Sequence, residues 1–157
     1  MKKIFLLLII LPFVSLAQDE TPTVKRDKIV ITNLISQQLP ELYRQNKFTE
    51  VINLMTEDFI MTNYVDGKEE IIMGKAELRR FYTERNYKDF NPTYTIKAFR
   101  ILKNRAFMSG SYININDKVT KPVSFLMTLT KQPDKSWLIS HVISAANLNL
   151  INKHNLK

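Results

Sequence analysis

Helical periodicity occurs three times in the first half of the chain. The longest apolar stripe starts near Asp27 and consists of Ile31, Leu34, Ile35, Leu39 and Leu42. Pro40 interrupts this stripe, so we expect a kink or a break in the helix near Gln38. Shorter patterns predict a second helix over Phe48–Met55 and a third after Gly74. The third helix presents Leu78, Phe81 and Tyr82 on one face.

Alternation with a period of two replaces the helical pattern in the remaining segments. Phe59–Val65 and Glu69–Met73 flank Asp66-Gly67, a dipeptide typical of a hairpin turn. The later strands are predicted over Thr93–Lys103, Ala106–Ile115, Val119–Lys131 and Ser136–Ser144. Under strict alternation, one face of the last strand carries Trp137, Ile139, His141 and Ile143. Helices followed by an antiparallel meander predict an α+β domain with the helices on one face of a curved sheet.

Three stretches carry a resemblance to a known superfamily: Asn46–Asp58, Gly74–Tyr82 and Trp137–His141. In order and spacing they are similar to the nuclear transport factor 2-like superfamily, in its SnoaL-like and ketosteroid-isomerase-like branch. The resemblance implies a cone-shaped half-barrel, in which a curved, mostly antiparallel sheet has three helices from the N-terminal half packed on its concave side. Such proteins include isomerases, dehydratases, cyclases, ligand binders and interaction modules, so the fold does not specify the function.

The two ends of the chain differ from the SnoaL-like domain expected over residues 27–146. A secretory signal peptide is predicted over residues 1–17, with cleavage after Ala17. It begins with the basic residues Lys2 and Lys3, which are followed by an apolar run and by small residues up to Ala17. The apolar stretch is shorter than the roughly 20 residues that span a bilayer, so we expect no stable membrane anchor after cleavage. Residues 18–26 predict a flexible lead-in, and residues 147–157 a polar tail. The protein is therefore expected to be exported, either periplasmic or secreted.

Composition narrows the function classes further. The 157 residues carry a formal net charge of +8, with no cysteine and two histidines. The absence of cysteine excludes a disulfide framework and a thiol nucleophile. The basic residues are scattered without interleaved aromatics, so we expect a solubilising surface and no nucleic-acid partner. No metal-ligand spacing is present, so we expect no metal and no cofactor.

The isomerase chemistry of the resembled family requires groups that this chain lacks at the matching positions. The general base would fall on Asn63, five residues after Asp58, and an amide cannot accept and return a proton near neutral pH. The oxyanion-binding tyrosine of the first helix would fall on Leu39. The second donor would lie in Val119–Pro133, which contains no acidic residue. Steroid-isomerase activity is therefore not expected.

Two catalytic candidates and a binding pocket remain. His141 and Tyr82 are the candidates for a rearranged site, although His141 can equally be a packing residue. The resemblance implies that a pocket is lined by Phe59, Met61, Asn63, Phe81 and Tyr82. Apolar walls with an amide and a phenol are typical of a small-molecule site, and the alternative is that these side chains fill the cone.

The leading hypothesis is an exported, non-catalytic domain that binds a small apolar ligand or a partner protein and forms a homodimer through its sheet. The alternatives are an isomerase- or dehydratase-type enzyme with a rearranged site, and a pure protein-interaction module of the immunity-like or envelope accessory kind.

Overall fold

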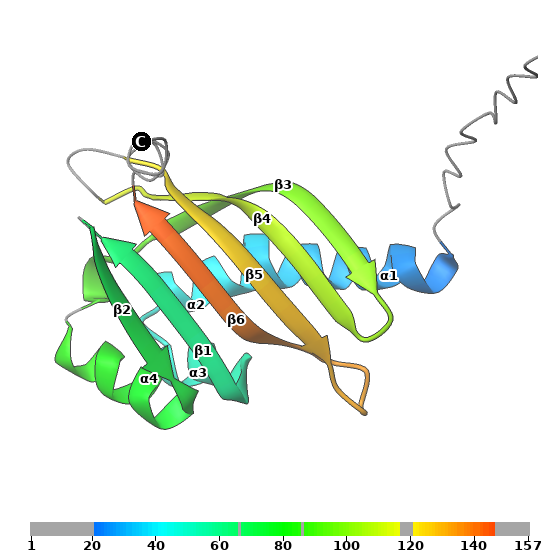
Figure 1. Ribbon diagram of the computed structural model, residues 1–157, viewed down its shortest axis with the longest axis horizontal. Helices are drawn as coiled ribbons and strands as arrows, with labels where there is room; N and C mark the ends of the chain where they lie inside the picture. Colours follow the sequence, from blue (N-terminus) through cyan, green and yellow to red (C-terminus); the bar gives the residue numbers. More distant parts are fainter. Residues whose placement is uncertain (1–20, 66, 86, 117–120, 147–157) are drawn as a thin grey trace, which may run out of the picture.

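The computed structural model describes residues 21–65, 67–85, 87–116 and 121–146. The expected signal peptide, the polar tail and residues 18–20 of the lead-in lie outside these ranges. A single curved sheet forms one layer, and the helices cover one of its faces (Figure 1). The predicted α+β architecture is therefore confirmed.

The first helical segment runs without a break from Pro22 to Arg44 but changes its winding on the way. Helix α1 (Pro22–Asn33) continues into a π-helical turn η1 (Leu34–Gln38) and then into α2 (Leu39–Arg44). In a regular helix the ring of Pro40 would clash with the carbonyl four residues before it. The wider π turn relieves this conflict. The predicted kink near Gln38 is thus a change of helical pitch.

The flexible lead-in predicted up to Arg26 is wrong for residues 22–26, because α1 begins at Pro22. The Thr21 hydroxyl accepts a hydrogen bond from the Val24 N–H at 3.4 Å. Proline suits this first turn because a helix has no internal acceptor for an N–H there. The Thr21 cap and Pro22 therefore stabilise the start of a helix in a segment whose polar composition does not predict one.

Asp27 connects the first helix to two residues of the sheet, Lys131 and Trp137. Its two carboxylate oxygens accept hydrogen bonds from the Lys131 ammonium at 2.9 and 2.6 Å. The Trp137 indole N–H donates to one of the same oxygens at 3.2 Å. A buried carboxylate is stable only when its charge is compensated, and here both the cation and the indole supply that compensation.

The other expected helices are present as α3 (Phe48–Asn53) and α4 (Gly74–Glu84). A short 3₁₀ turn, η2 (Tyr87–Asp89), lies between α4 and the strand that follows it. No helix in the described ranges has the length and apolar character that crossing a membrane requires.

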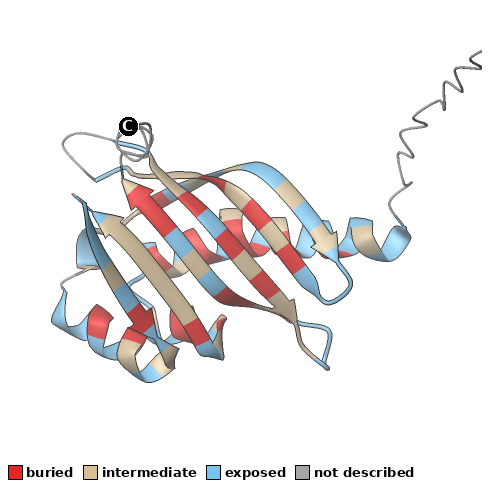
Figure 2. Ribbon diagram, in the orientation of Figure 1, coloured by how far each residue is buried: buried red, intermediate tan, exposed pale blue. Residues whose placement is uncertain are grey.

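The sheet has the strand order β2-β1-β6-β5-β4-β3. Its strands are β1 (Met55–Val65), β2 (Lys68–Met73), β3 (Pro92–Leu102), β4 (Arg105–Asn114), β5 (Val123–Lys131) and β6 (Trp137–Ala146). Only β1 and β6 pair in parallel, and β3 to β6 form the expected meander. Figure 2 shows buried residues recurring along β4, β5 and β6, which form the centre of the core.

Strand β6 does not alternate strictly, because it contains a β-bulge at Ser140. The residues on either side of Ser140 pair with two consecutive residues of β5, so one residue of β6 is extra. Trp137 and Ile139 are buried against the helices, whereas His141 and Ile143 are exposed on the outer face of the sheet. The predicted common face of these four residues is therefore wrong beyond the bulge.

Candidate functional site

A cavity of about 230 Å³ lies between the helices and the concave face of the sheet. Its walls come from α2, α4, η2 and all six strands, and the lining extends to Val65 and Ala146 at the ends of β1 and β6. The five residues that the sequence analysis assigned to the pocket all line it: Phe59, Met61, Asn63, Phe81 and Tyr82. The side chains therefore frame a space and do not fill the cone.

All six tyrosines of the chain line this cavity. They are Tyr43, Tyr64, Tyr82, Tyr87, Tyr94 and Tyr112. Sequence reasoning named only Tyr82 among them. Tyr94 and Tyr112 lie directly opposite each other on β3 and β4, with ring centroids 5.4 Å apart. The available signal was the inward alternation of β4, in which Tyr112 shares a face with the buried Ala106 and Met108.

Four aromatic rings form a closed circuit beside the cavity. The centroids are 6.0 Å apart for Tyr43 and Tyr82, 5.3 Å for Tyr82 and Tyr87, 5.6 Å for Tyr87 and Phe90, and 4.9 Å for Phe90 and Tyr43. All four contacts are edge-to-face, the arrangement that the ring quadrupoles favour. Because the rings come from α2, α4 and the η2 segment, the circuit fixes these three elements around the cavity.

The Tyr43 and Tyr82 hydroxyls are hydrogen-bonded to each other, with 2.5 Å between the oxygens. Burial is the main cause that raises the pKa of both phenols well above the ordinary tyrosine value. Burial likewise raises the pKa of Tyr87 to about 12. These hydroxyls are therefore neutral at physiological pH, where they can donate hydrogen bonds but do not serve as bases.

Tyr43 is a cavity residue that the position-by-position comparison with the resembled family did not identify. That comparison puts Leu39 at the place of the oxyanion-binding tyrosine, and Leu39 does line the cavity. Tyr43 lies four residues later on α2 and lines it as well, with 6% of its surface exposed. The first helix therefore does supply a hydroxyl to the cavity. Residues four positions apart lie on the same face of a helix, so the position of Leu39 was the signal that could have identified Tyr43.

A second polar pair lies on the sheet side of the cavity. The Ser144 hydroxyl donates a hydrogen bond to the Asn63 side-chain oxygen at 2.6 Å, between the adjacent strands β6 and β1. This bond directs the amide NH₂ of Asn63 away from Ser144 and leaves it as a donor in the cavity wall. At the position to which the resemblance assigns the isomerase base, the cavity wall thus carries an amide and no carboxylate.

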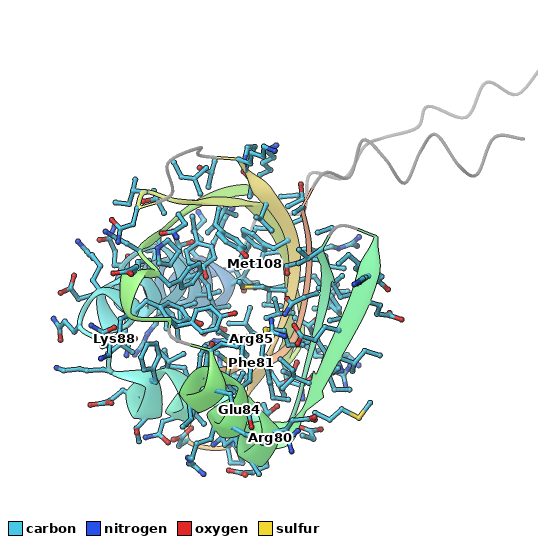
Figure 3. The ribbon with its side chains drawn as sticks, turned by 90° about the vertical axis from the view of Figure 1, so that its left-hand side faces the viewer. Arg80, Phe81, Glu84, Arg85, Lys88 and Met108 are labelled. Carbon is cyan, nitrogen blue, oxygen red and sulfur yellow. The ribbon has the colours of Figure 1, made fainter. Side chains whose placement is uncertain are left out.

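Charged groups lie at the rim of the cavity. Arg85, at the end of α4, forms an ion pair with Glu70 of β2. The Arg85 guanidinium carbon also lies 4.8 Å from the centroid of the Phe81 ring. Figure 3, viewed from this end, shows Phe81 and Arg85 nearer the centre of the molecule than Arg80 of the same helix. The Arg85–Glu70 ion pair therefore lies between the aromatic wall of the cavity and the solvent.

The second catalytic candidate does not reach the cavity. His141 is exposed on the outer face of the sheet, paired with Thr128 on β5 and Ile60 on β1. It is therefore not brought together with Tyr82, and the bulge at Ser140 is the reason. Within the described ranges, no group of three potential ligands among histidine, aspartate and glutamate could hold a metal ion.

Comparisons with known proteins give likeness in structure alone. No protein-family model and no curated protein sequence matches the chain. A nuclear transport factor 2-like protein with a cystatin-like fold from Novosphingobium aromaticivorans aligns with a TM-score of 0.62 and 12% identity, covering 80% of this chain and 85% of that one. A nuclear transport factor 2-like protein of unknown function from Shewanella oneidensis aligns with a TM-score of 0.60 and 19% identity, covering 77% and 98%.

A third solved structure, a ketosteroid isomerase-like protein from Erwinia carotovora, aligns with a TM-score of 0.56 and 18% identity, covering 78% of this chain and 97% of that one. Each alignment spans most of both chains. The chain therefore has the nuclear transport factor 2-like cone fold that the sequence resemblance predicts. At these identities the likeness concerns the fold, and function has to be argued from the cavity.

Proposed function

We propose that this protein is a binding domain that takes up a small, mainly apolar molecule in its cone cavity. The observation that carries this proposal is the cavity of about 230 Å³ with aromatic walls and a few hydrogen-bonding groups at fixed places. Apolar walls with sparse polar groups are the usual composition of small-molecule sites, because the walls supply affinity and the polar groups fix orientation.

The cavity volume limits the size of the ligand. An apolar cavity of roughly 150 Å³ accommodates benzene, and pockets for drug-sized ligands begin at roughly 300 Å³. A cavity of about 230 Å³ lies between these values. The expected ligand therefore has one or two rings, or an aliphatic body of similar volume.

Binding without catalysis is better supported than an isomerase or dehydratase reaction. Among the described residues that line the cavity, Glu70 is the only carboxylate, and its charge is compensated by Arg85. Tyr82 contacts a second phenol, and burial keeps both protonated. A proton-shuttling base would need a free group within reach of the ligand, and the described walls offer none.

Two substitutions on neighbouring residues of β6 test the proposal. Val142 lines the cavity, whereas Ile143 is exposed on the outer face of the same strand. Native mass spectrometry of the protein purified from its own host should show a retained small molecule. Val142→Phe should lose that molecule because the added ring occupies the cavity, and Ile143→Phe should keep it. Bare chains in the unmodified protein, or equal retention by both variants, would contradict the proposal.

We also propose that the outer face of the sheet forms a homodimer. Ile71, Leu126 and Ile143 are 45%, 46% and 43% exposed. The pairing of β2, β1, β6 and β5 places them in one row across the sheet, interrupted by Thr62. Exposed apolar rows of this kind mark association surfaces. Sedimentation analysis should give a dimer, and Leu126→Glu should give a folded monomer; a monomeric unmodified protein would refute this part.

Export to the periplasm or the medium is likewise proposed from the sequence. The Lys2-Lys3 start, the apolar run and the small residues before Gln18 support it. N-terminal sequencing of the protein from its host should begin at Gln18. A chain that retains its first residues in the cytoplasm would show that the segment is not a cleaved signal.

A further inference from the structure

The proposed function leaves open the charge of the ligand, and here the geometry points to a small organic cation of the quaternary ammonium type. This inference rests on the proposed binding function and assigns a ligand class to the same cavity. Its first support is the concentration of aromatic rings. The cavity is lined by all six tyrosines of the chain together with Phe59, Phe81 and Phe90. Aromatic faces attract cations through the negative charge of the ring face, and cages of such rings recognise quaternary ammonium groups.

The phenols of the wall are electron-rich and uncharged. Burial raises the pKa of Tyr43, Tyr82 and Tyr94. The rings therefore keep their protons at physiological pH, and a cation in the cavity meets neutral π faces and hydroxyl oxygens. An alkylated ammonium group needs no hydrogen-bond acceptor, because its charge is spread over methyl groups that pack as apolar surface.

The Arg85 side chain already makes a cation–π contact with an aromatic ring of the wall. The Arg85 guanidinium carbon lies 4.8 Å from the centroid of Phe81, within the range of a favourable cation–π contact. Its charge is compensated by Glu70. Arg85 is the only lysine or arginine among the described lining residues. No further cation in these walls therefore opposes a positively charged ligand.

The rim adds a negative contribution. Glu70 lines the cavity, and its neighbour Glu69 accepts a hydrogen bond from the lining Tyr64 hydroxyl at 2.6 Å. Glu70 is the only carboxylate among the described lining residues, and Glu69 lies next to it outside the lining. An anionic ligand would find the only lining cation already engaged by Glu70, so the observations favour a cation.

A pair of ligands with the same shape tests the charge directly. Benzyltrimethylammonium and neopentylbenzene differ by a single atom, a positively charged nitrogen in place of a neutral carbon. Water holds the cation more strongly, so an ordinary apolar cavity binds the neutral compound more tightly. The aromatic cage should reverse this order. In titrations followed by NMR at low salt, we expect benzyltrimethylammonium to bind about tenfold more tightly than neopentylbenzene.

The outcomes separate this inference from the proposed function. Tighter binding of neopentylbenzene would overturn the cation assignment while it supports an apolar binding cavity. Binding of neither compound would also overturn the assignment, and the native mass spectrum would then decide the proposed function by itself.

A matched pair of variants locates the effect in the aromatic wall. Tyr87 lines the cavity on η2, with its ring 5.3 Å from both Phe81 and Tyr82. Tyr87→Phe keeps the ring and should keep the preference for the cation. Tyr87→Leu should weaken benzyltrimethylammonium binding about fivefold and leave neopentylbenzene nearly unchanged. An equal loss for both compounds would show a packing role for Tyr87 and count against the cage.

Discussion

The two ends of the cone are built on the same sheet but from different side chains. At the end where α1 crosses the sheet, the fully buried residues are mostly aliphatic, including Ile31, Ile35 and Leu129, and Asp27 closes that end with Lys131 and Trp137. At the other end, tyrosines and phenylalanines surround the cavity. We call these the filled end and the hollow end.

The difference shows how a fold of this size maintains an internal space. Aliphatic side chains adjust to one another and close voids, and interiors accordingly pack as densely as crystals. Aromatic rings that contact each other edge to face are stiff and hold their separation. The ring circuit of Tyr43, Tyr82, Tyr87 and Phe90 therefore keeps the hollow end open, while the filled end supplies most of the stability.

Alkaline pH should have the largest effect, and it acts on the hollow end. The pKa values of Tyr43, Tyr82 and Tyr94 are raised from the ordinary value of 10.0. The unfolded chain therefore loses these protons at lower pH than the folded protein does. With Tyr87, whose pKa is raised to about 12, these tyrosines make a contribution to stability that is constant below about pH 10 and falls above it, by on the order of 5 kcal/mol per pH unit for four groups.

Circular dichroism and phenolate absorbance, recorded together along a pH titration, measure this loss. Unfolding and the ionisation of the buried tyrosines should coincide. Tyr94→Phe should make the decline about one quarter shallower, because it removes one of the four tyrosines whose pKa burial raises. Ionisation of all the tyrosines in a chain that stays folded would show that the hollow end is open to hydroxide.

Gly110→Ala should disturb the boundary between the two ends. Gly110 lies on the inner face of β4, and a Cβ there would lie 2.0 Å from the Thr95 backbone oxygen and 3.0 Å from the Phe125 ring. Strands β3 and β4 would have to separate. We expect a loss of about 3 kcal/mol or more in the free energy of unfolding, measured by urea denaturation. Ser109→Ala, on the next residue, should change it by less than about 0.5 kcal/mol.

Truncation of a large side chain to alanine should lower the free energy of unfolding more at the filled end than at the hollow end. Leu129 is fully buried at the filled end, so Leu129→Ala should cost about 3 kcal/mol. Met61 is only partly buried and borders the cavity. Met61→Ala should cost below about 1 kcal/mol, because the removed atoms already faced open space. Equal costs in urea denaturation would show that the hollow end is packed as tightly as the filled one.

Asp27→Asn should give a smaller change than Leu129→Ala. The amide keeps the shape of the carboxylate but removes the charge that compensates Lys131. Because the Lys131 side chain is 21% exposed and can reach water, we expect a loss of about 1–2 kcal/mol. Hydrogen exchange should rise in the first turns of α1 and remain unchanged in α4. Faster exchange in α4 would mean that the two ends are coupled.

The sequence predicted those elements of the fold whose periodicity is regular. Strand β5 alternates as expected, with Phe125, Met127 and Leu129 buried and Leu126 exposed. The errors arise where one residue is added to a regular repeat. The π turn before Pro40 and the bulge at Ser140 each shift the phase of the residues that follow, and neither leaves a clear mark in a hydrophobic pattern.

The candidate site was predicted in part for the same reason. The resemblance assigned Phe59, Met61 and Asn63 to the pocket, and all three line the cavity because they alternate along one strand. Tyr43 and Tyr94 belong to elements that meet only in the folded chain, and no local spacing connects them. The placement of His141 required knowledge of the bulge, which depends on pairing with β5.

The bulge at Ser140 makes β6 a strand with two possible faces. If Ser140 instead paired regularly with Thr128, no residue of β6 would be extra and the sides that follow would be exchanged, so that His141 would face the helices and Val142 the solvent. An imidazole would then enter the aromatic enclosure without any change of side-chain type. For protein engineering, the pairing register of one strand therefore determines whether this scaffold carries a titratable group inside its cavity.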